Sequence, residues 1–286
     1  MKLLTFKITP KANFATLPKG DTIFGQIVSF SYKMGYNLFD DYLNNPNLIV
    51  SDMMPFGYVY RPTLMLECFK DDERKEIDKK KLRKKKFIKL EHLQQGKLYK
   101  CEKIDFYEEI LTIKNSINRD FFSTTEESFT PYSLIEYNFK QTLWIFMLIE
   151  ESIESKIIEI FKKVSEFGFG KKATIGKGAF EIEQITNPIK NFETNYYMSI
   201  SPTIINCCNF EKVYYDTFVR FGKFGLDRAN ENAFKKPVIM LESSAIIKSK
   251  LDKPYFGCSL NNGTENKKSY QQGISIAIPI KDIKCL

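Results

Sequence analysis

The stretch from Gly168 to Gly178 reads GFGKKATIGKG and holds four glycines and three lysines in eleven positions. Glycine permits positive φ and close backbone approach, so main-chain N–H groups can converge on an anion while lysines supply charge. Apolar residues at helical spacing precede the stretch, and an alternating apolar pattern follows it. The pattern predicts a helix, a phosphate-binding loop and a strand, with a helix C-cap and flexible turn as the plain alternative.

Two nucleotide-binding motifs do not fit this stretch. A P-loop needs four residues between its first glycine and Gly-Lys-Ser/Thr, but five separate Gly170 from Gly176, and Gly178 follows Lys177. In the dinucleotide motif, Ala173 stands where the third glycine belongs. Both motifs also follow a strand and open a helix. We therefore favour a nucleic-acid backbone over a nucleotide cofactor as the ligand.

Charge is concentrated in one segment of the chain. The 286 residues carry a net charge of +8, and the segment from Lys70 to Lys86 holds ten basic and five acidic residues. A basic balance favours polyanionic partners. The segment has almost no apolar face, so we expect a mobile insertion that is either a solvated helix or disordered. Its charged side chains either face solvent or contact RNA.

The sequence gives little support for catalysis, metal binding or export. The six cysteines form no C-x-x-C pair, which favours a reduced, cytoplasmic chain, and no apolar run is long enough to span a membrane. His92 is the one histidine, so a paired acid–base site of the ribonuclease type cannot form from histidines. We expect no cofactor, no metal and no enzymatic activity.

The N-terminal pattern begins with a strand around Leu4 to Ile8 and continues with a helix that Gly20 or Asp21 caps. Lys19 and Gly20 therefore stand at a positive helix terminus, which is either a second phosphate contact or an ordinary capped helix start. We expect a loop from Asn44 to Pro55 and a strand around Tyr58 to Phe69.

The rest of the pattern completes an α+β fold. An insertion over 105–137 predicts a hairpin, and an apolar strand over Lys140–Ile149 leads to the helix before the glycine loop. Residues 1–187 then read strand, helix, strand, twice over, which predicts a ferredoxin-like (RRM-like) domain. We place a boundary at Asn187-Pro188 and expect a smaller β-rich α+β domain over 188–286. It contains a basic stretch, Arg220–Arg228, and ends in an alternating strand, Ile274–Ile280.

These pieces together resemble a known family. A glycine loop between the last helix and last strand of a ferredoxin-like domain resembles the RAMP superfamily of CRISPR proteins. Three further stretches look like the helix-opening motif, internal hairpin and final strand of the fourth subunit of the type III-A (Csm) effector complex: KGDTIFG (19–25), NSINR (115–119) and GISIAIPI (273–280). The second domain would then be a degenerate ferredoxin-like fold.

The resemblance implies a non-catalytic RNA-binding subunit. It would hold the repeat-derived 5′ handle of the CRISPR RNA and meet target RNA in the guide duplex through a thumb-like hairpin. It would also dock the large polymerase-type subunit beside the adjacent backbone RAMP subunit. The residues that match the family motifs are the expected RNA contacts: Lys19, Gly20, Asp21, Thr22, Gly25, Asn115, Ser116, Arg119, Gly168, Gly170, Lys171, Lys172, Thr174, Gly176, Lys177 and Gly178.

Two other functions stay open at this point. A RAMP endoribonuclease that cuts CRISPR repeats would use His92 with a lysine or tyrosine. An enzyme that uses nucleotides would hold a triphosphate in the glycine loop. Cleavage of repeat RNA favours the first, and preference for a mononucleotide over RNA favours the second.

Overall fold

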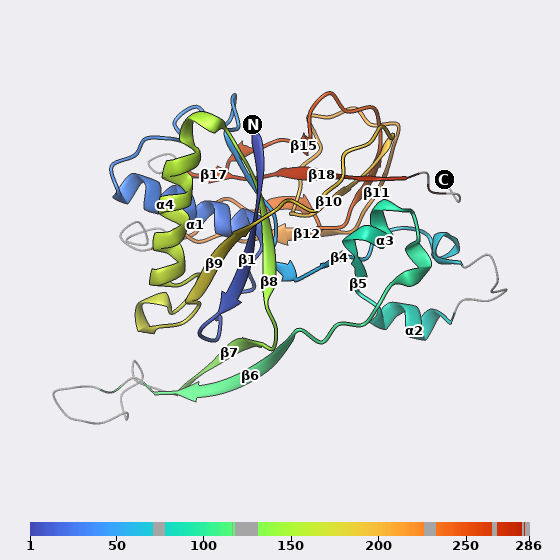
Figure 1. Cartoon of the computed structure of the whole chain (residues 1–286). Coiled ribbons are helices and arrows are strands. Elements are labelled where there is room, and N and C mark those ends of the chain that lie inside the picture. The colour runs from blue at the N-terminus through green and yellow to red at the C-terminus, as the bar shows by residue number, and fades with distance from the viewer. Residues whose placement is uncertain are drawn as a thin grey trace.

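The computed structural model describes residues 1–70, 78–115, 117, 131–225, 233–264, 268–281 and 283. Two five-stranded antiparallel sheets form its framework within this part of the chain. Two long helices, α1 (Gly20–Lys33) and α4 (Glu154–Phe167), lie side by side against the first sheet (Figure 1). The α+β class predicted from the sequence is confirmed.

The first sheet has the order β2-β8-β1-β9, and β3 also pairs with β8. Its strands are β1 (Lys2–Pro10), β2 (Leu48–Val50), β3 (Met54–Pro55), β8 (Leu143–Ile149) and β9 (Phe180–Ile185). Every residue of β8 is buried. This central position explains why the sequence of β8 is apolar throughout rather than alternating.

The second strand of this sheet lies earlier than the sequence predicted. The segment expected to be loop contains β2 and β3, while the expected strand at 58–69 contains β4 (Tyr58–Tyr60) and a 3₁₀ helix, Leu66–Phe69. The loop prediction was wrong, and the strand prediction is confirmed only over Tyr58–Tyr60, outside the first sheet. A three-residue strand with every residue buried shows no alternation, so the pattern of period two could not reveal β2.

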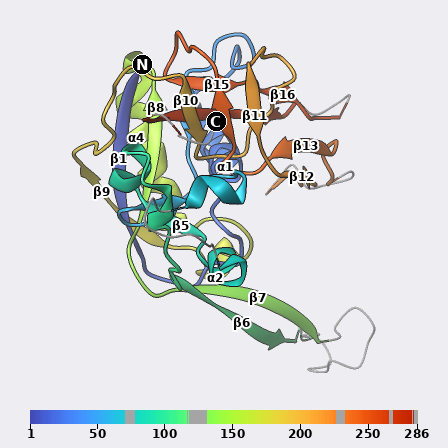
Figure 2. The same cartoon turned by 90° about the vertical axis from the view of Figure 1, so that its right-hand side faces the viewer.

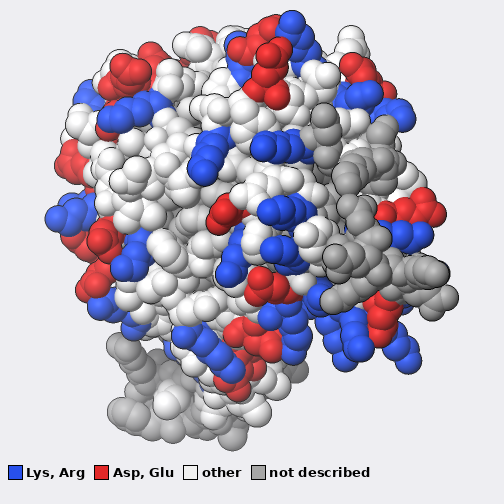
Figure 3. Space-filling model, turned by 45° about the vertical axis from the view of Figure 1, so that its right-hand side comes forward, with Lys and Arg blue, Asp and Glu red and all other residues white. Residues whose placement is uncertain are grey.

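Part of the basic insertion is folded. A short helix, α2 (Lys79–Lys84), is capped by Asp78, whose side chain accepts a hydrogen bond from the backbone N–H of Lys81. Leu82 is buried, and the other residues of α2 are exposed. Figure 3 shows Lys and Arg side chains gathered at the lower right of this face, the side on which α2 lies in Figure 1. Residues 71–77 lie outside the described residues.

Three more short elements follow α2, namely β5 (Phe87–Lys89), α3 (Leu90–Gln94) and a 3₁₀ helix, Leu98–Lys100. Next come β6 (Tyr107–Lys114) and β7 (Tyr132–Phe139), which pair with each other along their whole length. They confirm the predicted hairpin, and Figures 1 and 2 show it projecting from the body of the protein.

The second sheet has the order β11-β14-β10-β18-β15. Its strands are β10 (Tyr196–Ser199), β11 (Lys212–Tyr214), β14 (Ile246–Lys248), β15 (Tyr255–Gly257) and β18 (Ile274–Ile280). Two small ribbons accompany it: β12 (Thr217–Arg220) with β13 (Val238–Leu241), and β16 (Leu260–Asn261) with β17 (Tyr270–Gln271). Pro279 pairs with Tyr197 at a point beyond the pairing with β15, as its missing N–H requires.

The two halves of the chain share a core. One face of the first sheet packs on α1 and α4, through residues such as Phe6, Ile27 and Phe161. The opposite face packs on the second sheet, where Phe146 and Met198 belong to one buried cluster. Each five-stranded sheet lies on its own side of the expected boundary at Asn187-Pro188, and no strand pairing in the described chain crosses it.

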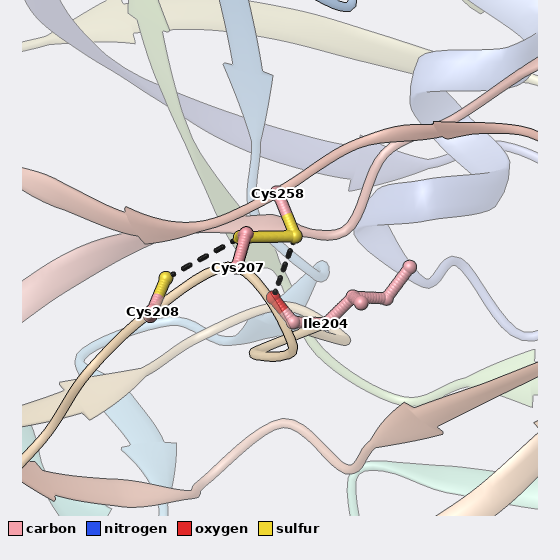
Figure 4. Close-up of a disulfide and its surroundings, with 4 residues drawn as sticks. All are labelled: Ile204, Cys207, Cys208 and Cys258. Carbon is pink, nitrogen blue, oxygen red and sulfur yellow. Dashed lines mark hydrogen bonds between the residues drawn. A yellow bond between two sulfur atoms is a disulfide. The ribbon is translucent and has the colours of Figure 1, made fainter.

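The cysteines depart from the reduced state that we expected. Cys207 and Cys258 form a disulfide, 51 residues apart in sequence, and the Cys208 thiol lies 3.5 Å from the sulfur of Cys207 (Figure 4). Ile204 brings the two segments together by accepting a hydrogen bond from the Cys258 N–H. Sequence spacing could not reveal this pairing. Among the described helices, none combines the length and apolar character needed to cross a membrane.

Candidate nucleic-acid interface

The glycine loop is closed at its base. The Phe169 N–H donates to the Gly178 carbonyl, and the Gly178 N–H donates to the Asn13 carbonyl. A Cβ on Gly178 would lie 2.2 Å from the Phe169 oxygen, and a Cβ on Gly168 would lie 2.2 Å from the Lys177 oxygen. Both glycines have positive φ. These close approaches require glycine and leave residues 171–176 as a protruding turn.

The protruding turn carries exposed lysines. Lys171 and Lys172 are exposed, as are Thr174 and Gly176. Lys172 adopts a left-handed conformation with φ of 62° before a short 3₁₀ helix, Ala173–Ile175. Its ammonium lies 4.8 Å from the centre of the Tyr132 ring and donates a hydrogen bond to the Tyr132 hydroxyl. The turn therefore presents two exposed cations, and Lys172 lies beside an aromatic ring of the hairpin.

The backbone N–H groups at the start of the turn bond within the protein. The Gly170 N–H donates to Gln26 Oε1, and the Lys171 N–H donates to Thr16 Oγ1. Gln26 Nε2 also donates to the Gly168 carbonyl. These contacts fix the loop on α1 and on the segment before it. The two amides do not face outward, so anion binding at this end of the loop depends on the lysine side chains.

Lys177 joins the glycine loop to the hairpin. Its ammonium pairs with Glu136 of β7, a carboxylate with 1% of its side chain exposed. Asn13 donates to the same carboxylate, and Lys114 of β6 lies 3.5 Å from it. Burial alone would raise the pKa of Glu136, but the hydrogen bonds from Lys177 and Asn13 and the nearby lysine charges lower it to about 2. Lys177 thus acts as a brace within the protein.

The start of α1 has a buried charge network. Lys19 pairs with Asp52 at 2.9 Å and lies 3.7 Å from Glu242. The Gly20 N–H donates to Asp52, as do the hydroxyls of Tyr60 and Ser243. Burial acts to lower the pKa of Lys19, but Asp52 and the other neighbours outweigh it and the pKa is raised. The Lys19 ammonium is therefore held inside the fold.

Asp21 connects α1 to the second half of the chain. It is buried and accepts a bidentate pair of hydrogen bonds from Arg220, at 2.7 and 2.9 Å, and a third from Gln271. Burial raises the pKa of Asp21, and the Arg220 charge opposes that rise. Thr22 Oγ1 donates to the Lys19 carbonyl, while Gly25 has open space around its Cβ position.

The glycine loop is bonded to α1, the helix that opens with the second predicted group of residues, through Gln26 rather than through residues 19–25. The glycine loop contacts Thr16 and Gln26, and Gln26 lies about 10 Å along α1 from Lys19. Asn115 follows the end of β6 and is exposed. Ser116 and Arg119 lie outside the described residues.

Sequence reasoning missed an exposed apolar face on the hairpin. Leu111, Ile113 and Ile135 are 65%, 75% and 48% exposed, and Leu111 lies opposite Ile135. The other face, with Tyr132 and Glu136, contacts the glycine loop. Alternation of Leu111 and Ile113 with polar neighbours was a visible signal, but it indicated an ordinary half-buried strand.

The candidate catalytic residue is the one histidine of the chain, His92. His92 on α3 is partly buried, and its buried Nδ1 has no hydrogen-bond partner among the described residues. Burial lowers its pKa, and Lys100 and Lys89 add to that effect. The described residues also contain no group of three or more histidine, cysteine or acidic side chains arranged to hold a metal ion.

Comparisons with known proteins agree with the resemblance drawn from the motifs. No family model matches the chain. A curated relative, the CRISPR system Cms protein Csm4 of Thermococcus onnurineus (strain NA1), is 23% identical over 200 residues, which cover 64% of this chain and 68% of the relative. A chain in the crystal structure of a Csm3–Csm4 subcomplex of the type III-A CRISPR-Cas interference complex superposes with a TM-score of 0.63 and 14% identity. The match covers 98% of this chain and all of that one.

A chain in the crystal structure of a Csm1–Csm4 cassette in complex with cA4 superposes with a TM-score of 0.61 and 14% identity, and 98% of each chain is covered. Csm4 is the component common to both complexes and to the curated match. The chain is similar in sequence to Csm4 over 200 residues, and its fold is similar to that of chains in two complexes that contain Csm4. The likeness in fold extends over nearly the whole chain.

Proposed function

We propose that this Csm4-like chain is a non-catalytic RNA-binding subunit of a type III-A (Csm) CRISPR complex, and that it holds the 5′ handle of the CRISPR RNA in antiviral defence. The glycine loop is the observation that carries the proposal. Its two exposed lysines, Lys171 and Lys172, stand on a turn fixed both to α1 and to the hairpin. A rigid turn with outward cations suits a phosphate backbone that must be held in one register.

The loop residues divide between contact and support in this proposal. Lys171 and Lys172 pair with handle phosphates, and the exposed Thr174 adds a hydroxyl. Lys177 supports the turn through Glu136. Gly168, Gly170, Gly176 and Gly178 all have positive φ, so they shape the turn rather than contact bases.

The start of α1 supports the same surface. Gly20 and Asp21 are buried, and Thr22 bonds to the backbone of Lys19, so these residues hold the helix in place. The Lys19 ammonium is paired with Asp52, so Lys19 also supports the fold here rather than offering a free cation. Further along α1, a Cβ at Gly25 would meet no atom within 4 Å.

The hairpin is the proposed thumb. The exposed Leu111 and Ile113 provide apolar side chains that can wedge between bases of the guide–target duplex, and Asn115 stands beside them. Ser116 and Arg119 complete this contact in the proposal. The four-stranded path β2-β8-β1-β9, with α1 and α4 on one face, supports a ferredoxin-like RAMP domain over residues 1–187.

The expected protein partners are the large polymerase-type subunit and the adjacent backbone RAMP subunit. Similar chains occur in structures of a Csm1–Csm4 cassette and a Csm3–Csm4 subcomplex. Likeness over 98% of this chain supports the same two neighbours, because no large part of the fold departs from theirs.

The test is binding of the full chain to a CRISPR RNA with its handle and to the same RNA without it. We expect preference for the handle-bearing RNA, loss of that preference in Lys171→Ala/Lys172→Ala, and intact RNA after incubation. Cleavage of the RNA that disappears in His92→Ala would instead support the endoribonuclease. Equal binding of both RNAs would contradict the handle assignment.

A further inference from the structure

The ribbon of β12 and β13 carries an aromatic and basic surface that the proposed function leaves unused. The two strands pair from Thr217 with Leu241 to Arg220 with Val238. The ladder continues beyond them, because the Lys235 N–H donates to Gly222 and the Phe224 N–H donates to Ala233. The ribbon is thus longer than its two named strands.

The two faces of the ribbon differ. On the inner face, Val238 and Met240 are buried and pack with Phe218 and Ile204. On the outer face, Val219 lies opposite Ile239, and these side chains are 46% and 70% exposed. The inner face accounts for the stability of the ribbon, and the outer apolar face has no structural role within the described chain.

Two rings extend the outer face toward the end of the ribbon. Phe221 is 73% exposed and Phe234 is 58% exposed. The Lys223 ammonium lies 4.6 Å from the centre of the Phe234 ring. Large exposed aromatic side chains are unusual on a folded protein unless they meet a partner.

The described residues of the ribbon carry charge of one sign, while the segment between its strands, 226–232, adds Asp227, Arg228 and Glu231. Residues 217–225 and 233–241 contain four cations and no carboxylate. The cations are Arg220, Lys223, Lys235 and Lys236. Lysine is depleted at the centres of protein–protein interfaces, whereas lysine alternating with aromatic rings is the pattern of surfaces that stack unpaired bases. The chemistry therefore favours single-stranded RNA over a protein partner.

The ribbon is fixed to the same helix as the glycine loop. Arg220 at the end of β12 binds Asp21 near the start of α1, and Gln26 of α1 holds the loop. Figure 2 shows the ribbon and the β6–β7 hairpin projecting to the same side of the molecule. An RNA strand bound at the loop and the hairpin would thus leave on the side of the ribbon.

We infer that the β12–β13 ribbon is a second RNA-binding surface, on which Phe221 and Phe234 stack unpaired bases while Lys223 and Lys236 pair with the flanking phosphates. This inference rests on the proposed function, since it supposes that the chain binds RNA. The ribbon would add base stacking to the contacts that the glycine loop makes with the RNA backbone alone.

The experiment measures fluorescence anisotropy of the full chain with a 5′-labelled oligouridine of about 16 nucleotides over a series of salt concentrations. In Phe221→Ala/Phe234→Ala we expect affinity to fall by about fivefold or more for each ring, with the salt dependence unchanged, because stacking releases no counterions. Phe221→Tyr/Phe234→Tyr should restore affinity, since tyrosine also stacks.

The lysine variant has a different expected signature. Lys223→Ala/Lys236→Ala should lower the slope of log affinity against log salt by about 1.4, or about 0.7 for each lysine that no longer pairs with a phosphate. The unfolding midpoint should not change in either variant, because all four side chains are on the surface of the ribbon.

The outcomes separate this inference from the proposed function. Wild-type affinity in Phe221→Ala/Phe234→Ala, beside reduced affinity in Lys171→Ala/Lys172→Ala, would overturn the ribbon and leave the loop. The reverse pattern would support the ribbon and contradict the loop. Loss of binding to a partner Csm subunit with unchanged RNA affinity would show that the ribbon docks a protein and would also overturn the inference.

Discussion

The glycine loop and the start of α1 look alike in sequence but differ in structure. Each places lysine beside glycine near a helix end. The start of α1 suggests a phosphate site through its helix N-terminus, and the glycine loop through its lysines and flexible backbone. In the loop, Lys171 and Lys172 are exposed. At α1, Lys19 is paired with Asp52, which has no exposed side-chain surface. The difference teaches that the same pair of residue types can leave a lysine exposed or hold it against a carboxylate of the protein, and that only the first is available to a ligand.

The largest expected effect falls on the α1 network. Asp52→Ala removes the acceptor for Lys19, the Gly20 N–H, Tyr60 and Ser243. It leaves the partly buried Lys19 ammonium with Glu242, 3.7 Å away, as its remaining carboxylate partner. We expect the free energy of unfolding to fall by about 3–5 kcal/mol in denaturant titrations.

A matched control uses an exposed ion pair. Asp105→Ala breaks the pair with Lys103, in which both side chains are more than half exposed, and should change stability by less than about 1 kcal/mol. Equal losses of stability in Asp52→Ala and Asp105→Ala would contradict the claim that the buried pair at α1 contributes more to stability than an exposed pair.

The Glu136 brace gives the next effect, and it depends on pH. The pKa of Glu136 is lowered from 4.5 to about 2 in the folded protein. The ionised carboxylate therefore stabilises the fold fully above pH 4.5, and this contribution is lost as pH falls toward 2.

Stability of Glu136→Gln measured from neutral pH down to the acid range should lack this contribution. Glu181→Gln is the control, because its carboxylate is 68% exposed beside Lys11. If the difference in stability between wild type and Glu136→Gln stays constant as the pH falls below 4.5, the brace is not the ionised pair described here.

The two glycines of α1 should respond in opposite directions. A Cβ on Gly20 would lie 2.3 Å from the Val50 oxygen, whereas a Cβ on Gly25 meets nothing within 4 Å. Gly20→Ala should destabilise the protein by about 1–3 kcal/mol through overpacking. Gly25→Ala should stabilise it by about 0.5–1 kcal/mol, because alanine is the better helix former. Thermal unfolding of both variants checks this.

The smallest effect on stability is expected at the loop lysines. Lys171→Ala/Lys172→Ala should stay within about 0.5 kcal/mol of wild type, since both side chains are on the surface. A marked loss of stability in chemical unfolding would mean that these lysines, like Lys19, serve the fold.

The sequence predicted the order of elements where the patterns were long. The helix before the glycine loop and the strand after it are α4 and β9, as predicted, and the alternating final strand is β18. The short strand β2 was missed, because three buried residues carry no periodic signal. The Cys207–Cys258 disulfide was missed, because its partners are 51 residues apart in sequence and no local spacing links them.

The sequence indicated which residues belong to the candidate site, but not which partners surround their side chains. A carboxylate 33 residues downstream in the chain neutralises Lys19, and one 41 residues upstream holds Lys177. No local pattern of spacing encodes such long-range pairs. The same holds for Arg220, which looked like part of a basic stretch and instead anchors to Asp21.

The most direct test of the central claim is photo-cross-linking of a 4-thiouridine-labelled CRISPR RNA to the full chain, with the cross-linked peptides identified by mass spectrometry. We predict that uridines in the 5′ handle cross-link to peptides containing residues 168–178. Handle cross-links confined to other parts of the chain, with none in that segment, would contradict the claim that the glycine loop holds the handle.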